Sequence, residues 1–163
     1  MTVFYTQMES PLGPLLLTSD GHALTMLAMH DQKKGAQIQP EWRRDNGPFS
    51  DALEQLQAYF AGELTTFDLP LAPAGTAFQR RVWDALLTVS YGKTASYGDI
   101  ARLIESPKAC RAVGLANGQN PISIIIPCHR IIGANGKLTG YGGGLDRKQW
   151  LLDHELRFAP AMA

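Results

Sequence analysis

The segment that decides the fold reads Asn120-Pro121-Ile122-Ser123-Ile124-Ile125-Ile126-Pro127-Cys128-His129-Arg130. Its β-branched run, residues 122–126, is too short for a helix of its own and predicts a buried strand. Pro127 cannot donate a hydrogen bond to a sheet, so we expect the strand to end just before Cys128. Cys128, His129 and Arg130 would then lie together where a buried strand opens into a turn.

This turn carries the residue types of a cysteine nucleophile. A thiol with a pKa near ~8.5 is mostly protonated at neutral pH and needs a base or a positive charge to become a thiolate. His129 can supply the base and Arg130 the charge. Taken alone, a Cys-His pair is more typical of an inert buried cysteine followed by a basic turn, so the wider pattern has to decide.

Pro127-Cys128-His129-Arg130 resembles the active-site motif of the O6-alkylguanine-DNA alkyltransferases, and the likeness continues from about Gly75 to Glu155. The resemblance implies an α/β protein with a small ribonuclease H-like domain followed by a mainly helical domain with a helix-turn-helix. We expect these domains at residues 1–72 and 73–163. It also implies DNA repair, in which the cysteine takes the alkyl group from O6-alkylguanine, and from O4-alkylthymine, in double-stranded DNA.

Length and composition indicate the domain number and the compartment that we expect for this protein. The 163 residues suffice for one domain or two small ones. The sequence has no apolar run of about 18 residues and no signal-like N-terminus, so we expect neither a membrane span nor export. Cys110 and Cys128 are expected as reduced thiols in the cytoplasm, and no metal-ligand spacing is present.

The net charge is zero, but the charges are unevenly distributed. Residues 1–75 hold four basic and nine acidic side chains, whereas residues 76–163 hold eleven basic and six acidic ones. A basic second half could neutralise DNA phosphates, although ordinary solvated charge produces smaller asymmetries.

We expect the N-terminal half of the chain to provide structural support. Residues 3–8, 15–18 and 23–29 predict strands separated by Pro- and Gly-containing turns, and residues 31–48 predict a loop. Ser50 is expected to cap a helix that stops at Gly62. Residues 69–73, rich in proline, would join the two halves.

The second half predicts three helices before the cysteine segment. Thr76 and Gln79 have capping-box spacing, and the helix they start would end by Gly92. Two further helices would flank a break at residues 105–107, the second capped by Ser106. Its apolar face would comprise Ala109, Ala112, Val113 and Ala116. This pattern fits a DNA-binding helix-turn-helix, and equally a helical hairpin packed in the core.

The resemblance gives this second helix a role in the DNA minor groove. Ala109, Ala112 and Gly114 would keep it slim, and Arg111 would enter the base stack in place of a nucleotide turned out of the duplex. Arg130 is grouped with the DNA contacts, and Tyr97 would help turn the nucleotide out.

The resemblance also assigns the pocket around the cysteine. Glu155, from a Leu-Leu-x-His-Glu ending, would orient His129, which acts on Cys128 through a water molecule. Tyr141 would stack on the extruded base, and the Gly142 N–H and the Tyr97 hydroxyl would donate to it. The remaining expected pocket residues are Asn117, Asn120, Ile131 and Lys148.

Because the product is a thioether, each molecule should act once. No metal or cofactor is implied, and we expect the protein to be a monomer. Three other functions remain open. A cysteine hydrolase would use the same Cys-His-Glu set and turn over. An alkyltransferase-like binder would lack the thiol. A helix-turn-helix regulator would need polar base-reading side chains on its second helix.

Overall fold

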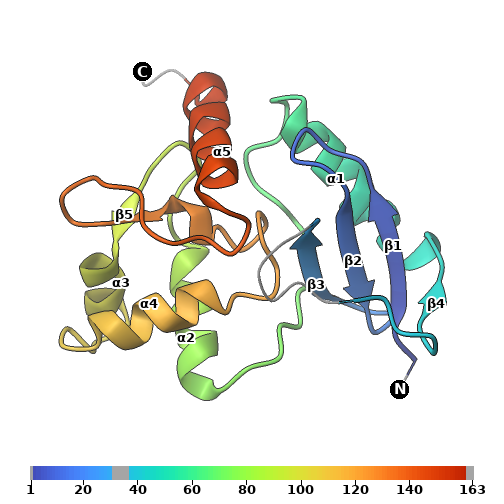
Figure 1. Ribbon diagram of the computed structural model, residues 1–163, viewed down its shortest axis with the longest axis horizontal. Helices are drawn as coiled ribbons and strands as arrows, with labels where there is room; N and C mark the ends of the chain where they lie inside the picture. The colour runs from blue at the N-terminus through green and yellow to red at the C-terminus, as the bar shows by residue number, and fades with distance from the viewer. Residues whose placement is uncertain (1, 31–36, 161–163) are drawn as a thin grey trace.

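The computed structural model describes residues 2–30 and 37–160, which form a sheet-containing N-terminal unit beside a mainly helical C-terminal unit (Figure 1). The N-terminal sheet comprises β1 (Phe4–Met8), β2 (Leu15–Ser19), β3 (Leu24–Met29) and β4 (Arg43–Arg44) in the order β3-β2-β1-β4. Neighbouring strands are antiparallel except for the β1–β4 pair. The three predicted strands are therefore confirmed.

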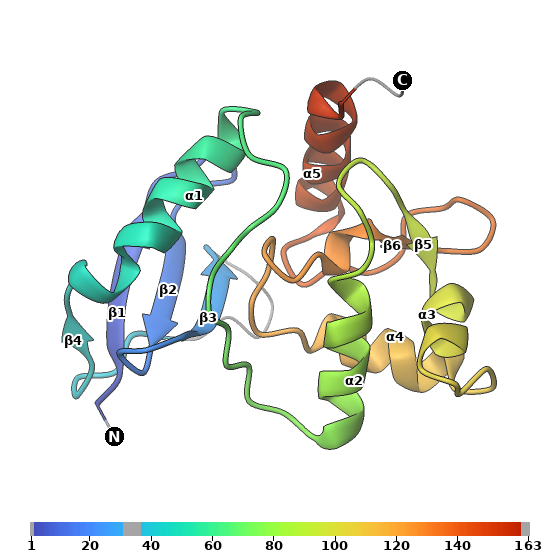
Figure 2. The ribbon, with the colours of Figure 1, turned by 180° about the vertical axis from the view of Figure 1, so that it is seen from behind.

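The helix α1 (Ser50–Phe60) covers one face of this sheet (Figure 2). Gly62, with a φ of 79°, ends it as predicted, because glycine adopts the left-handed conformation without a steric penalty. The prediction for its start is wrong. A short 3₁₀ turn, η1 (Gly47–Phe49), leads directly into the helix, so Phe49 occupies the N-cap position and Ser50 is already helical. The predicted loop 31–48 contains β4 as well as most of η1, and residues 31–36 lie outside the described residues.

The C-terminal unit contains four helices among the described residues: α2 (Ala77–Leu86), α3 (Tyr97–Leu103), α4 (Cys110–Gly118) and α5 (Leu145–Phe158). A short parallel pair, β5 (Ala95–Ser96) and β6 (Ile131–Ile132), lies beside them. The capping box of Thr76 and Gln79 is confirmed. The helix it starts ends at Leu86, and Gly92 belongs to the following turn with a φ of 77°.

Helices α3 and α4 form the predicted pair around a tight turn, but α4 begins later than expected. Glu105 turns the chain in the left-handed region, with a φ of 59°, and the Ala109 N–H donates to the Ser106 carbonyl. Because residues 106–109 close this turn, Ser106 and Pro107 precede the helix, and Ala109 is its N-cap.

The segment before the cysteine is buried, but the predicted strand is wrong. Only Ile122 forms a β-bridge, to Leu27 of β3, and the chain then turns through Ser123 and Ile125. Ile124 has a φ of 72°, a conformation that β-branched residues rarely adopt and that costs about 1–3 kcal/mol. Tertiary contacts have overridden the local preference for a strand.

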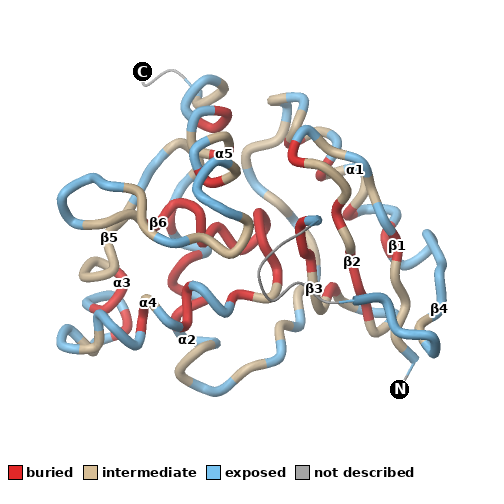
Figure 3. The backbone as a smooth tube through the Cα atoms, in the orientation of Figure 1, coloured by how far each residue is buried: buried red, intermediate tan, exposed pale blue. Residues whose placement is uncertain are grey.

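The two units share one apolar core. The Leu27 N–H donates to the Pro121 carbonyl at 2.9 Å, and the Ser123 N–H donates to the Leu27 carbonyl at 3.1 Å. Buried chain therefore runs from β2 and β3 into the centre of the C-terminal unit (Figure 3). The cysteine segment is thus anchored against the edge of the N-terminal sheet.

Candidate active site

The loop that carries Cys128 is held in shape by two asparagine side chains. Asn120 Nδ2 donates to the Ile126 carbonyl at 2.8 Å, while its Oδ1 accepts from the Ile122 N–H at 3.0 Å. Asn117, on α4, donates from Nδ2 to the Cys128 carbonyl at 3.4 Å. The loop is therefore fixed internally by Asn120 and joined to α4 by Asn117.

Cys128 and His129 lie in the 3₁₀ turn η2 (Cys128–Arg130), and Glu155 lies on α5. His129 Nε2 donates to Glu155 Oε2 at 2.7 Å, with the His129 side chain 0% and that of Glu155 1% exposed. His129 Nδ1 is buried and has no hydrogen-bond partner among the described residues. The carboxylate thus fixes the tautomer in which Nδ1 carries the free lone pair that a base requires.

Burial dominates the protonation of these groups. It raises the pKa of the Cys128 thiol and lowers the pKa of His129, where Glu155 opposes the effect. The pKa of Glu155 lies well below its usual range despite burial, because His129 and Arg130 stabilise the anion. The resting site therefore holds a thiol, a neutral imidazole and a carboxylate, the state from which general-base activation begins.

Arg130 does not have its predicted role. It is buried, and its guanidinium donates to Glu155 from Nε at 2.7 Å and from Nη2 at 3.0 Å. Its Nη1 donates to the Val89 carbonyl at 2.7 Å. Because the side chain is committed to these partners, we withdraw its assignment as a DNA contact and as the charge that acts on the thiol.

Burial raises the pKa of Cys128, and the cation that partly opposes this rise is Lys148, which is itself fully buried. Its Nζ donates to the Ile131 carbonyl at 2.5 Å and to the Thr139 carbonyl at 3.0 Å. Lys148 therefore also connects α5 to β6 and to the loop that follows β6.

A small cavity of about 10 Å³ lies over the thiol. Its lining residues are Asn117, Gly118, Asn120, Ser123, Cys128, Gly140, Tyr141 and Gly142. The structure thus brings together four of the predicted pocket residues with the nucleophile. Tyr97, Ile131 and Lys148 do not line this cavity. The Tyr97 hydroxyl is hydrogen-bonded to the Thr139 hydroxyl.

The helix α4 lies next to this cavity and contributes Asn117 and Gly118 to it. Val113 and Ala116 are buried, whereas Arg111 and Ala112 are exposed and Ala109 is half-buried. The predicted apolar face is therefore partly wrong, since Ala112 lies on the free surface. Leu115 extends that surface, with 61% of its area exposed. A Cβ added at Gly114 would lie 3.7 Å from the Tyr97 ring, so α4 and Tyr97 pack closely there.

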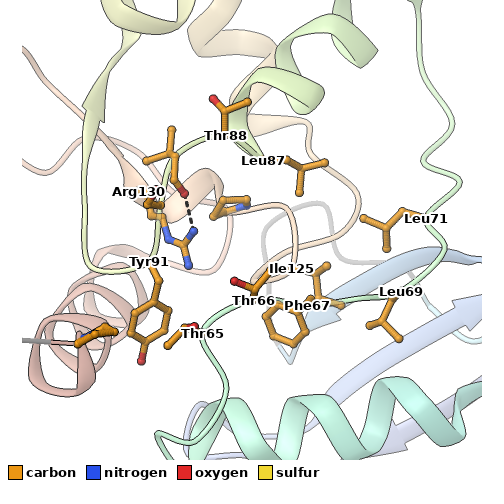
Figure 4. A pocket seen from close by; sticks show the side chains of 14 residues that line it. Thr65, Thr66, Phe67, Leu69, Leu71, Leu87, Thr88, Tyr91, Ile125 and Arg130 are labelled. Atoms are coloured by element: carbon orange, nitrogen blue, oxygen red, sulfur yellow. Dashed lines mark hydrogen bonds between the residues drawn. The ribbon is translucent and has the colours of Figure 1, made fainter.

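A larger groove of about 550 Å³ opens on the other side of the cysteine loop (Figure 4). Leu69 and Leu71 line it from the interdomain segment, and Ile125 and Pro127 from the cysteine loop. It does not include Cys128, so it is separate from the cavity over the thiol.

Sequence reasoning missed Tyr59 of α1, whose hydroxyl donates to Glu155 Oε2 at 2.6 Å. The two residues are 96 positions apart, so no local spacing could have indicated the contact.

In the described ranges, no group of three or more His, Cys, Asp or Glu side chains could hold a metal ion. No helix within these ranges has the length and apolar character needed to cross a bilayer.

Fold and site together define a class of protein. A buried thiol is followed in the chain by a histidine whose ring is hydrogen-bonded to a buried carboxylate, and an exposed, arginine-bearing helix of a helix-turn-helix lies beside them. This is the arrangement of a cysteine alkyl acceptor that works on DNA.

Comparison with known proteins identifies the family. Residues 3–73 match the ribonuclease-like domain of 6-O-methylguanine DNA methyltransferase, and residues 77–157 match its DNA-binding domain. The chain belongs to the O6-methylguanine-DNA methyltransferase family, also called the O6-alkylguanine-DNA alkyltransferases.

Individual relatives agree with this assignment. A methylated-DNA–protein-cysteine methyltransferase of Mycobacterium bovis is 57% identical over 98% of this chain and 96% of its own length. That of Methanosarcina acetivorans is 53% identical over 94% of this chain and 98% of its own. The crystal structure of Mycobacterium tuberculosis OGT in complex with DNA superposes with a TM-score of 0.89 at 57% identity, covering 97% of this chain and 96% of that one.

Proposed function

We propose that this protein repairs DNA by moving the alkyl group of O6-alkylguanine onto the sulfur of Cys128, once per molecule. The observation that carries the proposal is the buried thiol, whose neighbour His129 is held by Glu155, at the floor of a cavity that α4 helps to form. Relatives named methylated-DNA–protein-cysteine methyltransferases support it.

In the proposed reaction His129 Nδ1 takes the thiol proton through a water molecule. The sulfur then attacks the alkyl carbon, the carbon–O6 bond breaks, and its electron pair passes to the guanine, which gains a proton as it leaves. The imidazolium formed meanwhile is stabilised by Glu155. A thioether has no acyl carbon for water to attack, so the protein does not regenerate its thiol.

The remaining roles concern the base. We assign to Tyr97 and the Gly142 N–H the stabilisation of charge on the leaving guanine, and to Tyr141 the stacking on its ring. The Cys128 and Ile131 carbonyls would accept from its exocyclic amine. Asn117, Asn120 and Lys148 would keep this wall in place through the hydrogen bonds described above.

We further propose that α4 enters the minor groove of double-stranded DNA. Its exposed small residue Ala112 and the half-buried Ala109 and Gly114 allow close approach, and Arg111 is available to replace an extruded nucleotide. The crystal structure of Mycobacterium tuberculosis OGT in complex with DNA supports DNA as the partner.

The deciding experiment follows the label of radioactive O6-methylguanine in duplex DNA. Transfer to Cys128, located by peptide mass spectrometry and stopping at one label per molecule, supports the proposal. Release of labelled methanol would indicate a hydrolase, and retention of label on DNA would indicate a binder or a regulator. Cys110, which is exposed, is the internal control for nonspecific alkylation.

We propose that the protein works as a cytoplasmic monomer, because the reaction requires a reduced thiol and all the site residues come from one chain. We retain residues 1–72 and 73–163 as the proposed domains. Competition between O6-methylguanine, bulkier O6 adducts and O4-methylthymine in the same assay would define the range of substrates.

A further inference from the structure

Glu155 accepts from three different side chains. Arg130 Nε donates to Oε1, whereas Oε2 accepts from His129 Nε2, Arg130 Nη2 and the hydroxyl of Tyr59, the last at 2.6 Å. Hydrogen bonds to a charged group are stronger than those between neutral groups, so each donor affects how much negative charge the carboxylate offers to the others.

Tyr59 is the one donor in this set that comes from the N-terminal unit, since it lies on α1. Its side chain is 0% exposed, and its backbone carbonyl is hydrogen-bonded to His154 Nε2 at 2.7 Å. Neighbouring residues of α5, His154 and Glu155, thus hold Tyr59 at both its carbonyl and its hydroxyl. These two hydrogen bonds therefore fix the position of the hydroxyl. They join α1 of the N-terminal unit to α5 of the C-terminal unit (Figure 2).

We propose that Tyr59 is a positioning residue for alkyl transfer, through which the N-terminal unit sets how strongly Glu155 draws on the His129 proton. The inference rests on the proposed function, because it concerns the same His129 base. Tyr59 does not touch the reacting atoms and acts only through Glu155.

The expected direction follows from the shared oxygen. Without the Tyr59 hydroxyl, Oε2 keeps more negative charge for His129, and the imidazolium becomes more stable. A larger fraction of His129 is then protonated before reaction and cannot act as a base. The acid limb of the rate profile moves to higher pH, while the rate on the plateau, where His129 is neutral, changes little.

Several other titratable or charged side chains lie close to Glu155, His129 and Tyr59. These side chains must be the same in the parent protein and in the variants that are compared with it. Around Glu155 and His129 they are Tyr91, Cys128, Arg130, Tyr141 and Lys148, and His154 faces Tyr59. Tyr91 provides a matched control. Its ring lies 6.1 Å from that of Tyr59 and under the Arg130 guanidinium at 5.7 Å, but its hydroxyl has no hydrogen-bond partner among the described residues.

The test is the single-turnover rate of transfer from saturating labelled O6-methylguanine duplex, measured against pH for the parent, Tyr59→Phe and Tyr91→Phe. We expect Tyr59→Phe to lower the rate about threefold on the steepest part of the acid limb and to match the parent within about twofold on the plateau. Tyr91→Phe should follow the parent throughout.

Failure of the proposed function can be distinguished from failure of this inference. No transfer by the parent overturns the proposed function and this inference with it. Transfer by the parent with superimposable Tyr59→Phe and parent profiles overturns this inference alone, even if the variant melts at a lower temperature. A shift equal to that of Tyr91→Phe also overturns it.

A measurement on the unsubstituted protein covers the case in which Tyr59→Phe does not fold. The Tyr59 hydroxyl proton should give a slowly exchanging, downfield NMR signal whose shift changes as His129 titrates, because both donors share Oε2. A signal that is absent, or that is insensitive to this titration, contradicts the inference.

Discussion

Around Glu155 the charged side chains are buried and committed to one another, whereas on α4 the guanidinium of Arg111 is exposed and has no hydrogen bond or ion pair among the described residues. The first region is arranged before any substrate arrives. The second would find its partner on DNA, as proposed above. Groups that perform chemistry gain from preorganisation, while groups that meet DNA must stay accessible to it. Substitutions in the two regions should therefore fail in different ways.

The largest effect is expected at the nucleophile. Cys128→Ser should transfer no label, because a serine hydroxyl is far less nucleophilic than a thiolate. It should still bind DNA with nearly the parent affinity, since the buried thiol is not a phosphate contact. Label counting and a DNA-binding titration measure the two properties. Cys110→Ser is the control and should transfer normally; label on the Cys128→Ser protein would refute the assignment.

Glu155→Gln should be the next most severe change, and it should affect both stability and rate. It leaves the buried Arg130 cation without its carboxylate, which costs about 3–5 kcal/mol. It also removes the charge that stabilises the imidazolium, so transfer at neutral pH should slow by about one to two orders of magnitude. The rate should recover partly as pH rises and the thiol ionises by itself.

The same residue predicts a pH dependence of stability. The folded-state pKa of Glu155 is depressed, so its contribution is present above its usual value of 4.5 and is lost as pH falls toward the folded value. His129, whose pKa is lowered from 6.5, likewise favours the folded state above that pH and less below it. Melting temperature should thus fall in two stages on acidification. In Glu155→Gln the stage below pH 4.5 should be weaker; an unchanged acid profile would contradict the depressed pKa.

Arg111→Ala should distinguish the exposed surface of α4 from the buried site around Glu155 most clearly. Because Arg111 would replace the extruded nucleotide, repair in duplex DNA should slow by about 10- to 100-fold. Reaction with free O6-benzylguanine should change less than about twofold, since no nucleotide has to leave a duplex. Arg111→Lys is the matched control for charge alone. Equal losses on duplex and free base would mean that Arg111 supports the pocket or the fold.

Leu115→Ala should have the smallest effect. Leu115 is 61% exposed and lies one turn after Arg111 on α4, so truncation should leave the melting temperature almost unchanged. Loss of apolar contact with the minor groove should weaken DNA binding by about two- to fivefold. Leu103, 58% exposed on α3, is a control of similar exposure. A marked drop in melting temperature would show that Leu115 packs in the fold.

The sequence predicted the parts of the site that a motif carries. Cys128 and His129 are adjacent in the chain, and the ending that contains Glu155 resembles that of the family, so their association could be expected. The capping box of Thr76 and Gln79 and the helix stop at Gly62 depend on spacings of a few residues, which are readable without a structure. These local signals account for the correct placement of β1, β2 and β3 and of the start of α2.

Predictions that required tertiary information were less successful. The run of residues 122–126 has the composition of a strand, yet Asn120 ties it into a turn against β3. Arg130 has the chemistry of a phosphate contact, but the position of α5 turns it inward to Glu155. Tyr59 had no signal at all, because its role depends on how α1 meets α5. Each error concerns a contact between segments far apart in the chain.

The size of the cavity over Cys128 affects how readily the protein can bind a guanine base. At about 10 Å³ it has room for roughly one water molecule, so a guanine base can enter only if the lining residues move apart. The measured affinity for a free base is then its intrinsic affinity reduced by the fraction of molecules in which the cavity is open. If α4 binds DNA as proposed, duplex DNA gains additional binding free energy along this helix, and this gain offsets the cost of opening. A lesion in DNA would then be repaired faster than the same base in solution, even if the pocket made identical contacts with both.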